Sequence, residues 1–218
     1  MKNKPHSLFI LLASESPRRR EILTELGLPF QVIRSRYSEN DRNCNRPANL
    51  VKAHAVGKAK NAMVPFRKGI VLGADTIVYH KGKIYGKPRD KRQAVRMLSE
   101  LSGCCHRVYT GIALYDPDRG TMLCEYAKTL VWFKVLKASD IADYLKAVHP
   151  LDKAGAYAIQ EGPGIVRKIK GSYTNVIGLP AELLIRMLRK INSTKKLRFK
   201  PRGNRISTFA GQNFIAGQ

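Results

Sequence analysis

The sequence predicts an α/β protein in which strands and helices alternate along most of the chain. Two observations support this fold class. Apolar runs with β-branched residues repeatedly precede segments with helical spacing of apolar residues, and Gly, Pro or Ser residues separate the two kinds of segment. In addition, 218 residues with 44% hydrophobic content can bury a sizeable core. A structured domain is therefore expected.

The first half of the chain begins with an apolar stretch, Ser7–Ser14, that predicts a buried strand. The next segment predicts a helix, because Ser16 is a suitable N-cap, Pro17 suits the first helical position and Gly27 ends the apolar spacing. Further segments predict, in order, a strand, a helix, a strand and a helix: Phe30–Ser35, Ala48–Met63, Gly69–His80 and Lys91–Leu101.

The second half predicts two long strands, joined by a turn at Pro117–Gly120. These strands are His106–Asp116 and Thr121–Leu136. A helix over Ala138–Val148, with Ser139 as its cap, a strand and turn within Gly164–Gly178, and a final helix over Pro180–Ile191 follow. Residues 192–218 contain six Lys or Arg residues and no acid, which is typical of a flexible basic tail.

The composition of the chain limits the classes of binding partner and the cellular compartments that fit this protein. The net charge of +24 favours a polyanionic partner such as nucleic acid or a phosphate-rich small molecule. The four cysteines show no metal-ligand spacing and indicate reduced thiols, while no apolar run approaches the roughly 20 residues needed to span a bilayer. We therefore expect a cytoplasmic protein that does not insert into a membrane.

The predicted helix after Ser16 carries a charge pattern that helices disfavour. Arg18, Arg19 and Arg20 occupy its first turn, where the unpaired amides already create a positive potential and acidic residues are preferred. This arrangement predicts that an anion binds at the start of the helix.

Several other residues are candidates for chemistry, each with an ordinary structural alternative. Asp75 interrupts an apolar strand, where a carboxylate either serves function or is held by backbone amides. Lys58, Lys87 and Glu39 are, individually, typical of solvated surface residues. Gln160 lies among small residues where a planar ligand could approach, and its amide can both donate and accept hydrogen bonds.

Six motifs in order make the sequence resemble the Maf family of nucleoside triphosphate pyrophosphatases. They are SESPRR, GADT, GKPRD, LSG, DKAGAYAIQ and GSYTNVIGLP, and they extend from about Leu11 to Ile191. One departure is Glu161, which replaces the glycine usual after the family glutamine.

The resemblance implies an enzyme that cleaves nucleoside triphosphates to the monophosphate and pyrophosphate with a divalent cation, Mg or Mn. It also implies a mixed, twisted sheet flanked by helices, of the Maf/ITPase-like type, with two lobes around a central nucleotide cleft. We accordingly expect a Maf-like domain over residues 1–191, a basic tail over 192–218 and a homodimer.

Family positions assign roles to residues of this chain. The resemblance implies that Asp75 accepts a proton, that Lys58 and Lys87 assist catalysis at the phosphates, and that Glu39 and Asp75 bind the metal. The residues implied to bind substrate are Ser14, Arg18, Arg19, Thr76 and Gln160.

The identity of the base remains open at this point. Arg18, Thr76 and Gln160 match the branch of the family that resembles dTTP and UTP pyrophosphatases, and Gln160 suits the donor and acceptor edge of uracil or thymine. The same reaction on 7-methyl-GTP or another non-canonical nucleotide is the neighbouring alternative. A basic nucleic-acid-binding protein is an alternative of another class, and the tail could bind nucleic acid weakly and without specificity.

Overall fold

A seven-stranded mixed sheet forms the centre of the molecule. The structure, a computed structural model, describes residues 9–39, 46–63 and 69–193. The strand order is β2-β1-β3-β5-β6-β7, and β4 pairs with β3. The strands are β1 Ile10–Leu12, β2 Phe30–Val32, β3 Ile70–His80, β4 Lys83–Tyr85, β5 Cys105–Asp116, β6 Thr121–Phe133 and β7 Val166–Lys170.

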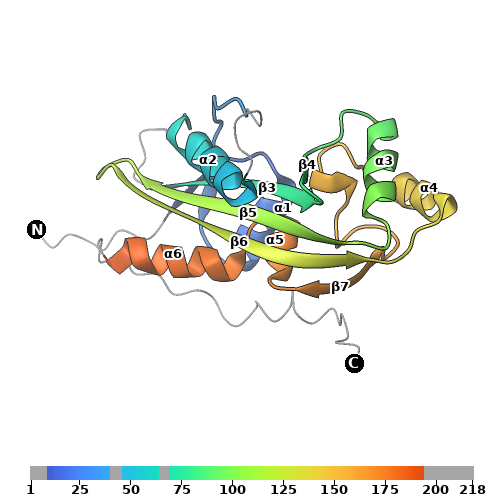
Figure 1. The fold of residues 1–218 in the computed structure, drawn as a ribbon. Helices are drawn as coiled ribbons and strands as arrows, with labels where there is room; N and C mark the ends of the chain where they lie inside the picture. Colours follow the sequence, from blue (N-terminus) through green and yellow to red (C-terminus); the bar gives the residue numbers. More distant parts are fainter. Residues whose placement is uncertain (1–8, 40–45, 64–68, 194–218) are drawn as a thin grey trace, which may run out of the picture.

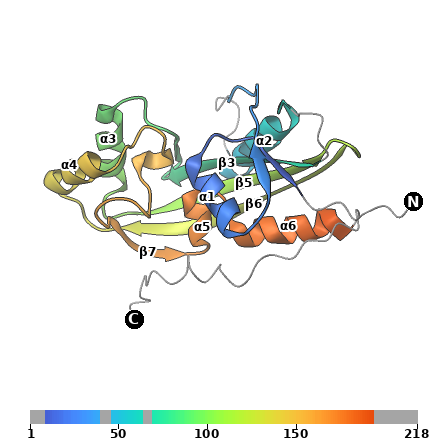
Figure 2. The same cartoon turned by 180° about the vertical axis from the view of Figure 1, so that it is seen from behind.

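Six α-helices flank this sheet within the described residues. They are α1 Pro17–Glu25, α2 Pro47–Lys60, α3 Lys91–Leu101, α4 Ala138–Ala147, α5 Tyr173–Ile177 and α6 Ala181–Ser193. Figure 1 shows α2 across β5 near one end of the long β5–β6 hairpin and α3 and α4 at the other end. The view from behind shows α1, α5 and α6 on the face opposite α2 (Figure 2). The α/β fold with a mixed sheet flanked by helices is confirmed.

Two hydrophobic clusters divide the interior into the two predicted lobes. One cluster packs β1 and the inner half of β3 against α1 and α6, around residues such as Leu23, Leu72 and Leu184. The other packs the outer halves of β3, β5 and β6 against α3 and α4, around Leu98 and Tyr144. Strand β3 runs through both lobes, so residues near its middle lie at the junction.

The middle of β3 has an open edge. Strand β1 pairs with β3 only over Ile70–Leu72, and β4 pairs only over Val78–His80. On that side of β3, the backbone between these two pairings therefore has no strand neighbour among the described residues. Asp75 and Thr76 lie within this gap, where a ligand can reach the strand.

Three local predictions differ from the structure. Strand β4 was not predicted, because three residues after a tight turn carry little pattern, and the short helix α5 replaces a predicted turn. Ser139 does not cap α4. The helix begins at Ala138, the start of its predicted range, with Lys137 at the N-cap position, and the Asp140 carboxylate accepts a hydrogen bond from the backbone N–H of Lys137 at 2.8 Å. Nearly all of the predicted basic tail, from residue 194 onward, lies outside the described residues.

Cysteine state and membrane insertion were also predicted from the sequence. Cys104, Cys105 and Cys124 are free thiols, in agreement with the prediction. In the described ranges, every helix is too short or too polar to cross a bilayer.

His106 is a buried titratable group in the second lobe. Its ring is 1% exposed, packs edge-on against Phe133 and Tyr157, and shares a 2.9 Å hydrogen bond with the Tyr157 hydroxyl. Burial, aided by nearby His80, lowers the pKa of His106 to about 3. His106 is therefore neutral in the folded protein at every physiological pH.

We expect this histidine to make the fold acid-sensitive. In the unfolded chain His106 binds a proton near pH 6.5, whereas in the folded chain it remains neutral until the pH approaches 3. The stabilisation of the folded state by the neutral ring is therefore complete above pH 6.5 and is lost as the pH falls toward 3. Between pH 7 and pH 5.5, this one group should lower the unfolding free energy by about 1.2 kcal/mol. Urea unfolding at both pH values measures the change. His106→Gln, which cannot titrate, should lose that share of the pH dependence; an unchanged dependence would assign it to other groups.

Candidate active site

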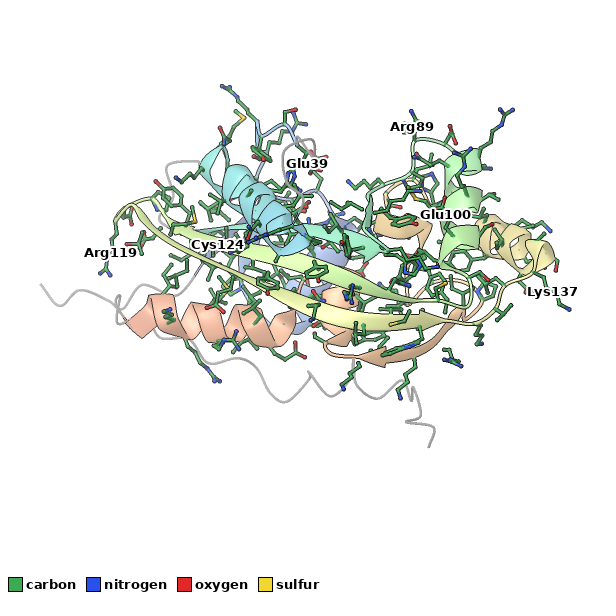
Figure 3. All side chains as sticks on the ribbon, in the orientation of Figure 1. Glu39, Arg89, Glu100, Arg119, Cys124 and Lys137 are labelled. Atoms are coloured by element: carbon green, nitrogen blue, oxygen red, sulfur yellow. The ribbon has the colours of Figure 1, made fainter. Side chains whose placement is uncertain are left out.

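A cavity of about 880 Å³ opens between the two lobes at the free edge of β3. Its lining comes from the end of β1, the start of α1, the last turn of α2, the middle of β3, the loop after β4 and the segment before β7. Figure 3 shows Glu39 beside α2 and Arg89 beside α3, on the two sides of this cavity. All nine residues that the sequence nominated line it: Ser14, Arg18, Arg19, Glu39, Lys58, Asp75, Thr76, Lys87 and Gln160.

Lys58 lies between two carboxylates at the centre of the cavity. Its Nζ atom is 2.7 Å from Oδ1 of Asp75 and 2.6 Å from Oε1 of Glu39. It also lies 3.4 Å from the carbonyl oxygen of Ala74 on the open edge of β3. The Lys58 and Asp75 side chains are only 15% and 10% exposed, whereas Glu39 is 49% exposed. The arrangement is a carboxylate–ammonium–carboxylate triad that opens to solvent at Glu39.

Glycines allow α2 to bring Lys58 to this position. A Cβ atom on Gly73 of β3 would collide with the backbone carbonyl of Ala55, and one on Gly111 of β5 would collide with that of Val51. Only glycine therefore permits the helix to lie this close to the sheet. The close approach positions the last turn of α2 over the middle of β3.

Asp75 is ionised in spite of its burial. Burial alone would raise the pKa of this carboxyl, but the adjacent Lys58 ammonium, with Arg19 and His54 further away, outweighs it and lowers the pKa below its ordinary value. The carboxylate is thus available at neutral pH as a proton acceptor or as an oxygen ligand.

Arg19 is built into the wall of the cavity. Its Nε donates to the carbonyl of Gly178 at 2.9 Å, and its terminal nitrogens donate to the hydroxyls of Ser14 at 2.8 Å and Thr76 at 3.2 Å. The residue is 9% exposed. Its guanidinium therefore fixes three segments that are distant in sequence: the end of β1, the middle of β3 and the turn after α5.

Arg18 has carboxylate partners within the chain. It forms a 2.8 Å ion pair with Asp152 and lies 3.9 Å from a carboxylate oxygen of Glu161. Lys153, only 5% exposed, contacts the same two acids at 2.9 and 3.1 Å. Although burial opposes the ionised form, hydrogen bonds from Lys153 and Arg18 lower the pKa of Asp152 to about 2. Glu161, which departs from the family glycine, thereby belongs to a four-membered charge network.

These contacts revise the expectation that the first turn of α1 needs an external anion. Ser16 occupies the N-cap position as predicted, although its side chain does not cap the helix, and Pro17 begins it. The charge on Arg18 is balanced by Asp152, the guanidinium of Arg19 is held by three oxygen acceptors, and Arg20 is exposed. Arg18 thus has a carboxylate partner within the chain, whereas the acceptors of Arg19 are uncharged and leave its positive charge available to an anion.

The remaining nominated residues differ in their surroundings. The Thr76 hydroxyl shares a 3.0 Å hydrogen bond with the hydroxyl of Thr110, in addition to the bond from Arg19. Gln160 and Lys87 are exposed at the rim, so their side chains are accessible to a ligand. Thr76 therefore helps to hold the wall of the cavity together. Gln160 and Lys87 instead present long, exposed side chains at its opening.

Sequence reasoning gave no role to several residues that line the cavity. Asp152 and Lys153 begin the motif DKAGAYAIQ, and Tyr157 lies within it. Arg89 is the fourth residue of the motif GKPRD. Their membership of these motifs was the only available signal. No pattern in the sequence indicates that Asp152 contacts Arg18, 134 residues earlier.

The donor set suits a divalent cation. Oε1 of Glu39 and Oδ1 of Asp75 contact Lys58 Nζ, and each carboxylate has a second oxygen of the kind through which hard cations such as Mg²⁺ or Mn²⁺ bind. Among the described residues, however, no group of three or more His, Cys, Asp or Glu side chains is placed to hold a metal ion. Two protein carboxylates match a cation that takes its other ligands from water and a substrate phosphate.

Comparison with known proteins agrees with this geometry. The family model described as "Maf-like protein" matches residues 9–191. A protein of Geobacter sp. (strain M21) named dTTP/UTP pyrophosphatase is 46% identical over 185 residues, which cover 84% of this chain and 96% of the relative. Relatives of the same name from Geobacter sulfurreducens and Gloeobacter violaceus are each 44% identical, over 84% of this chain and 97% and 96% of their own lengths. The chain belongs to the Maf family.

Proposed function

We propose that this protein hydrolyses dTTP and UTP to the nucleoside monophosphate and pyrophosphate. The observation that carries the proposal is the triad of Glu39, Lys58 and Asp75 in a cavity that is also lined by five other Lys or Arg residues. Such a cavity offers positive charge for a triphosphate and an ionised carboxylate beside it. Relatives 40–46% identical to this chain carry the name dTTP/UTP pyrophosphatase.

The cations have distinct roles in this proposal. Lys58 and Lys87 approach the phosphates and offset the charge that develops during cleavage. Arg18, at the start of α1, donates to phosphate oxygens together with the helix amides, and in doing so exchanges the bonds that its two terminal nitrogens make with the carboxylate and the carbonyl of Asp152. Arg19 holds the side chains of Ser14 and Thr76 in place. It therefore contributes to substrate binding by fixing the wall of the cavity.

Asp75 accepts the proton of the attacking water in this scheme. Its carboxylate is ionised at neutral pH, and the ammonium of Lys58 fixes its orientation through the 2.7 Å contact. A divalent cation, Mg or Mn, held by Glu39 and Asp75, would lower the pKa of bound water and neutralise phosphate charge. Lys58 contacts Oε1 of Glu39 and Oδ1 of Asp75, so the cation would bind through the other oxygen of each carboxylate.

A nucleotide panel tests the function. Purified protein is incubated with Mg²⁺ or Mn²⁺ and with dTTP, UTP, dCTP, GTP, ATP or 7-methyl-GTP, and pyrophosphate and orthophosphate are measured separately. We expect pyrophosphate, with the highest kcat/KM for dTTP and UTP. Preference for 7-methyl-GTP would support the neighbouring alternative, and release of orthophosphate would contradict cleavage between the α- and β-phosphates.

Gln160 is the proposed reader of the base. Its exposed amide can donate to a carbonyl and accept from the N–H of uracil or thymine. Gln160→Ala should lower kcat/KM for dTTP and UTP by about tenfold, because one or two hydrogen bonds to the base are lost. The ratio to kcat/KM for ATP, measured in the same panel, should fall as well; an unchanged ratio would place the base elsewhere.

The remaining expectations concern organisation. We propose a pyrophosphatase domain over residues 1–191, a basic extension over 192–218 that binds nucleic acid weakly, a homodimeric assembly and a cytoplasmic location. Free thiols at the three described cysteines are typical of a reducing compartment and support that location.

A further inference from the structure

The outer half of one sheet face carries a row of aromatic side chains. In antiparallel strands, directly paired residues lie on the same face, so the pairing of Tyr79 with Arg107, Tyr109 with Lys128 and Gly111 with Tyr126 defines this side. The rings of Tyr109 and Tyr126 stack with centroids 6.2 Å apart, and Tyr79 meets Tyr109 edge-on at 6.3 Å.

The row is accessible from solvent. Helix α2 covers only the part of this face nearer the turn between β5 and β6. Cys124, which Figure 3 places beneath α2, contacts the carbonyl of Lys52 there. Beyond the helix, Tyr126 is 45% exposed, and Tyr79, Tyr109 and Trp132 are partly exposed. Helices α3 and α4 pack on the opposite face, against side chains such as Val108 and Val131. Aromatic surface of this extent is therefore available to a partner.

Cations surround the aromatic side chains. Lys168 and Lys170 of β7 share the face, because they pair with Trp132 and Leu130. The Nζ atoms of Lys168 and Lys52 lie 5.9 and 6.0 Å from the ring centroids of Trp132 and Tyr126. With Arg107 and Lys128, these residues and the four aromatic side chains form what we call the aromatic–basic face.

Acidic side chains are absent from the described part of this face that lies beyond Asp75, which shares the face through its pairing with Gly111 and is ion-paired with Lys58. Among the described strand residues that share the face, at alternate positions of Cys105–Tyr109, Tyr126–Trp132 and Lys168–Lys170, none is acidic. Glu125, next to Tyr126 in sequence, lies on the other face and pairs there with Arg186 of α6 at 2.9 Å. The face consequently combines planar apolar rings with uncompensated positive charge.

We propose that the aromatic–basic face binds single-stranded nucleic acid, with bases stacked on the aromatic rings and phosphates contacting the surrounding lysines and Arg107. Unpaired bases stack on aromatic side chains in a sequence-tolerant way, and lysines beside the rings follow the backbone. A second copy of this chain fits poorly, because a twofold contact would place one positive face against another. None of the residues that form the aromatic–basic face lines the nucleotide cavity, although Ile77 and Ile84, the strand partners of Tyr109 and Tyr79, do line it, so the two sites adjoin.

Binding is measured with the full chain by fluorescence anisotropy of 20-nucleotide oligo-dT and oligo-U that carry 5′-hydroxyl ends. The absence of a 5′-triphosphate keeps the probe from resembling the substrate of the cavity. We expect binding at low salt that excess dTTP does not displace. A duplex of the same length should bind more weakly, because its bases are already stacked.

Matched variants separate stacking from charge. Tyr126→Leu should weaken oligonucleotide binding about tenfold, whereas Tyr126→Phe, which keeps the ring, should bind normally. Lys128→Ala with Lys168→Ala should lower the slope of log Kd against log salt by about 0.7 for each lost contact. Arg189→Ala on α6 removes a charge from the opposite side and serves as the control. Pyrophosphate release should remain unchanged in all of these variants.

Three results would overturn the proposal. The first is loss of binding in Lys195→Ala with Lys196→Ala while the face variants bind normally, which would assign binding to the tail. The second is a change of oligomeric state in Tyr126→Leu, by analytical ultracentrifugation, without a change in oligonucleotide affinity. The third is tighter binding of duplex than of single strands.

Discussion

Replacing Asp75 with Asn is expected to reduce pyrophosphate release from dTTP by a factor of about 10² to 10⁴, the usual loss when a general base is removed. The amide preserves the size of the side chain but cannot accept a proton at neutral pH, and it binds a divalent cation poorly. It also removes the ionic contact with Lys58, which keeps its second partner, Glu39. The loss should appear in kcat more than in KM.

The experiment requires evidence that the variant is folded. Circular dichroism and the thermal unfolding transition should show a native protein. Asp143→Asn provides the control, because it removes an exposed carboxylate of α4 that forms an ion pair with Lys146 and does not line the cavity. If Asp75→Asn retains more than a tenth of the wild-type rate, Asp75 is not the proton acceptor.

Much of the fold follows from local patterns in the sequence. Strand β3 and helix α3 have the predicted extents, apart from Gly69, because β-branched runs and regular apolar spacing leave few alternatives. Strand β4 and helix α5 were not predicted, since three and five residues carry too little periodicity. Their formation depends on pairing with β3 and on the Ser172 cap, which accepts from the N–H of Asn175.

The candidate site was predictable in its membership but not in its contacts. Asp75 was predicted because a carboxylate interrupts an apolar strand, whereas Lys58 and Glu39 lie outside the quoted motifs and were assigned roles only through the resemblance to the family. The triad that joins them depends on how closely α2 packs on the sheet, which Gly73 and Gly111 determine. These distances result from tertiary packing, so they could not be predicted from local sequence patterns.

The three arginines of α1 illustrate the same limit. Helix-dipole reasoning identified an unusual first turn but does not distinguish the three residues, and only the family resemblance assigned Arg18 and Arg19, and not Arg20, to the substrate. The structure separates them into an ion-paired Arg18, a buried Arg19 and an exposed Arg20. Asp152 and Gly178, the most distant partners of Arg18 and Arg19, lie 134 and 159 residues away, beyond any local signal.

Substitutions of Arg18 and Arg19 should therefore have different effects on stability. Arg19→Ala removes the shortest donor from the Gly178 carbonyl and the Ser14 hydroxyl and leaves them the longer bonds from the Thr76 hydroxyl at 3.4 Å and the Ser16 N–H at 3.3 Å, which should cost roughly 2–4 kcal/mol of unfolding free energy. Thermal unfolding should move down by roughly 5–15 °C. Arg18→Ala removes a partly exposed ion pair and should cost only about 0–1 kcal/mol.

Activity should fall in both variants, for different reasons. Arg18→Ala loses a charge-assisted contact to phosphate, so kcat/KM should drop roughly tenfold to a hundredfold while the protein remains stable, and the ranking of nucleotides should change. Arg19→Ala should lose activity together with stability, whereas Arg20→Ala should affect neither. Denaturant unfolding and kcat/KM for dTTP and UTP, measured on the same preparations, separate these cases. A stable Arg18→Ala protein with wild-type kcat/KM would show that Arg18 serves only its ion pair with Asp152, and that the triphosphate is bound by other cations of the cavity.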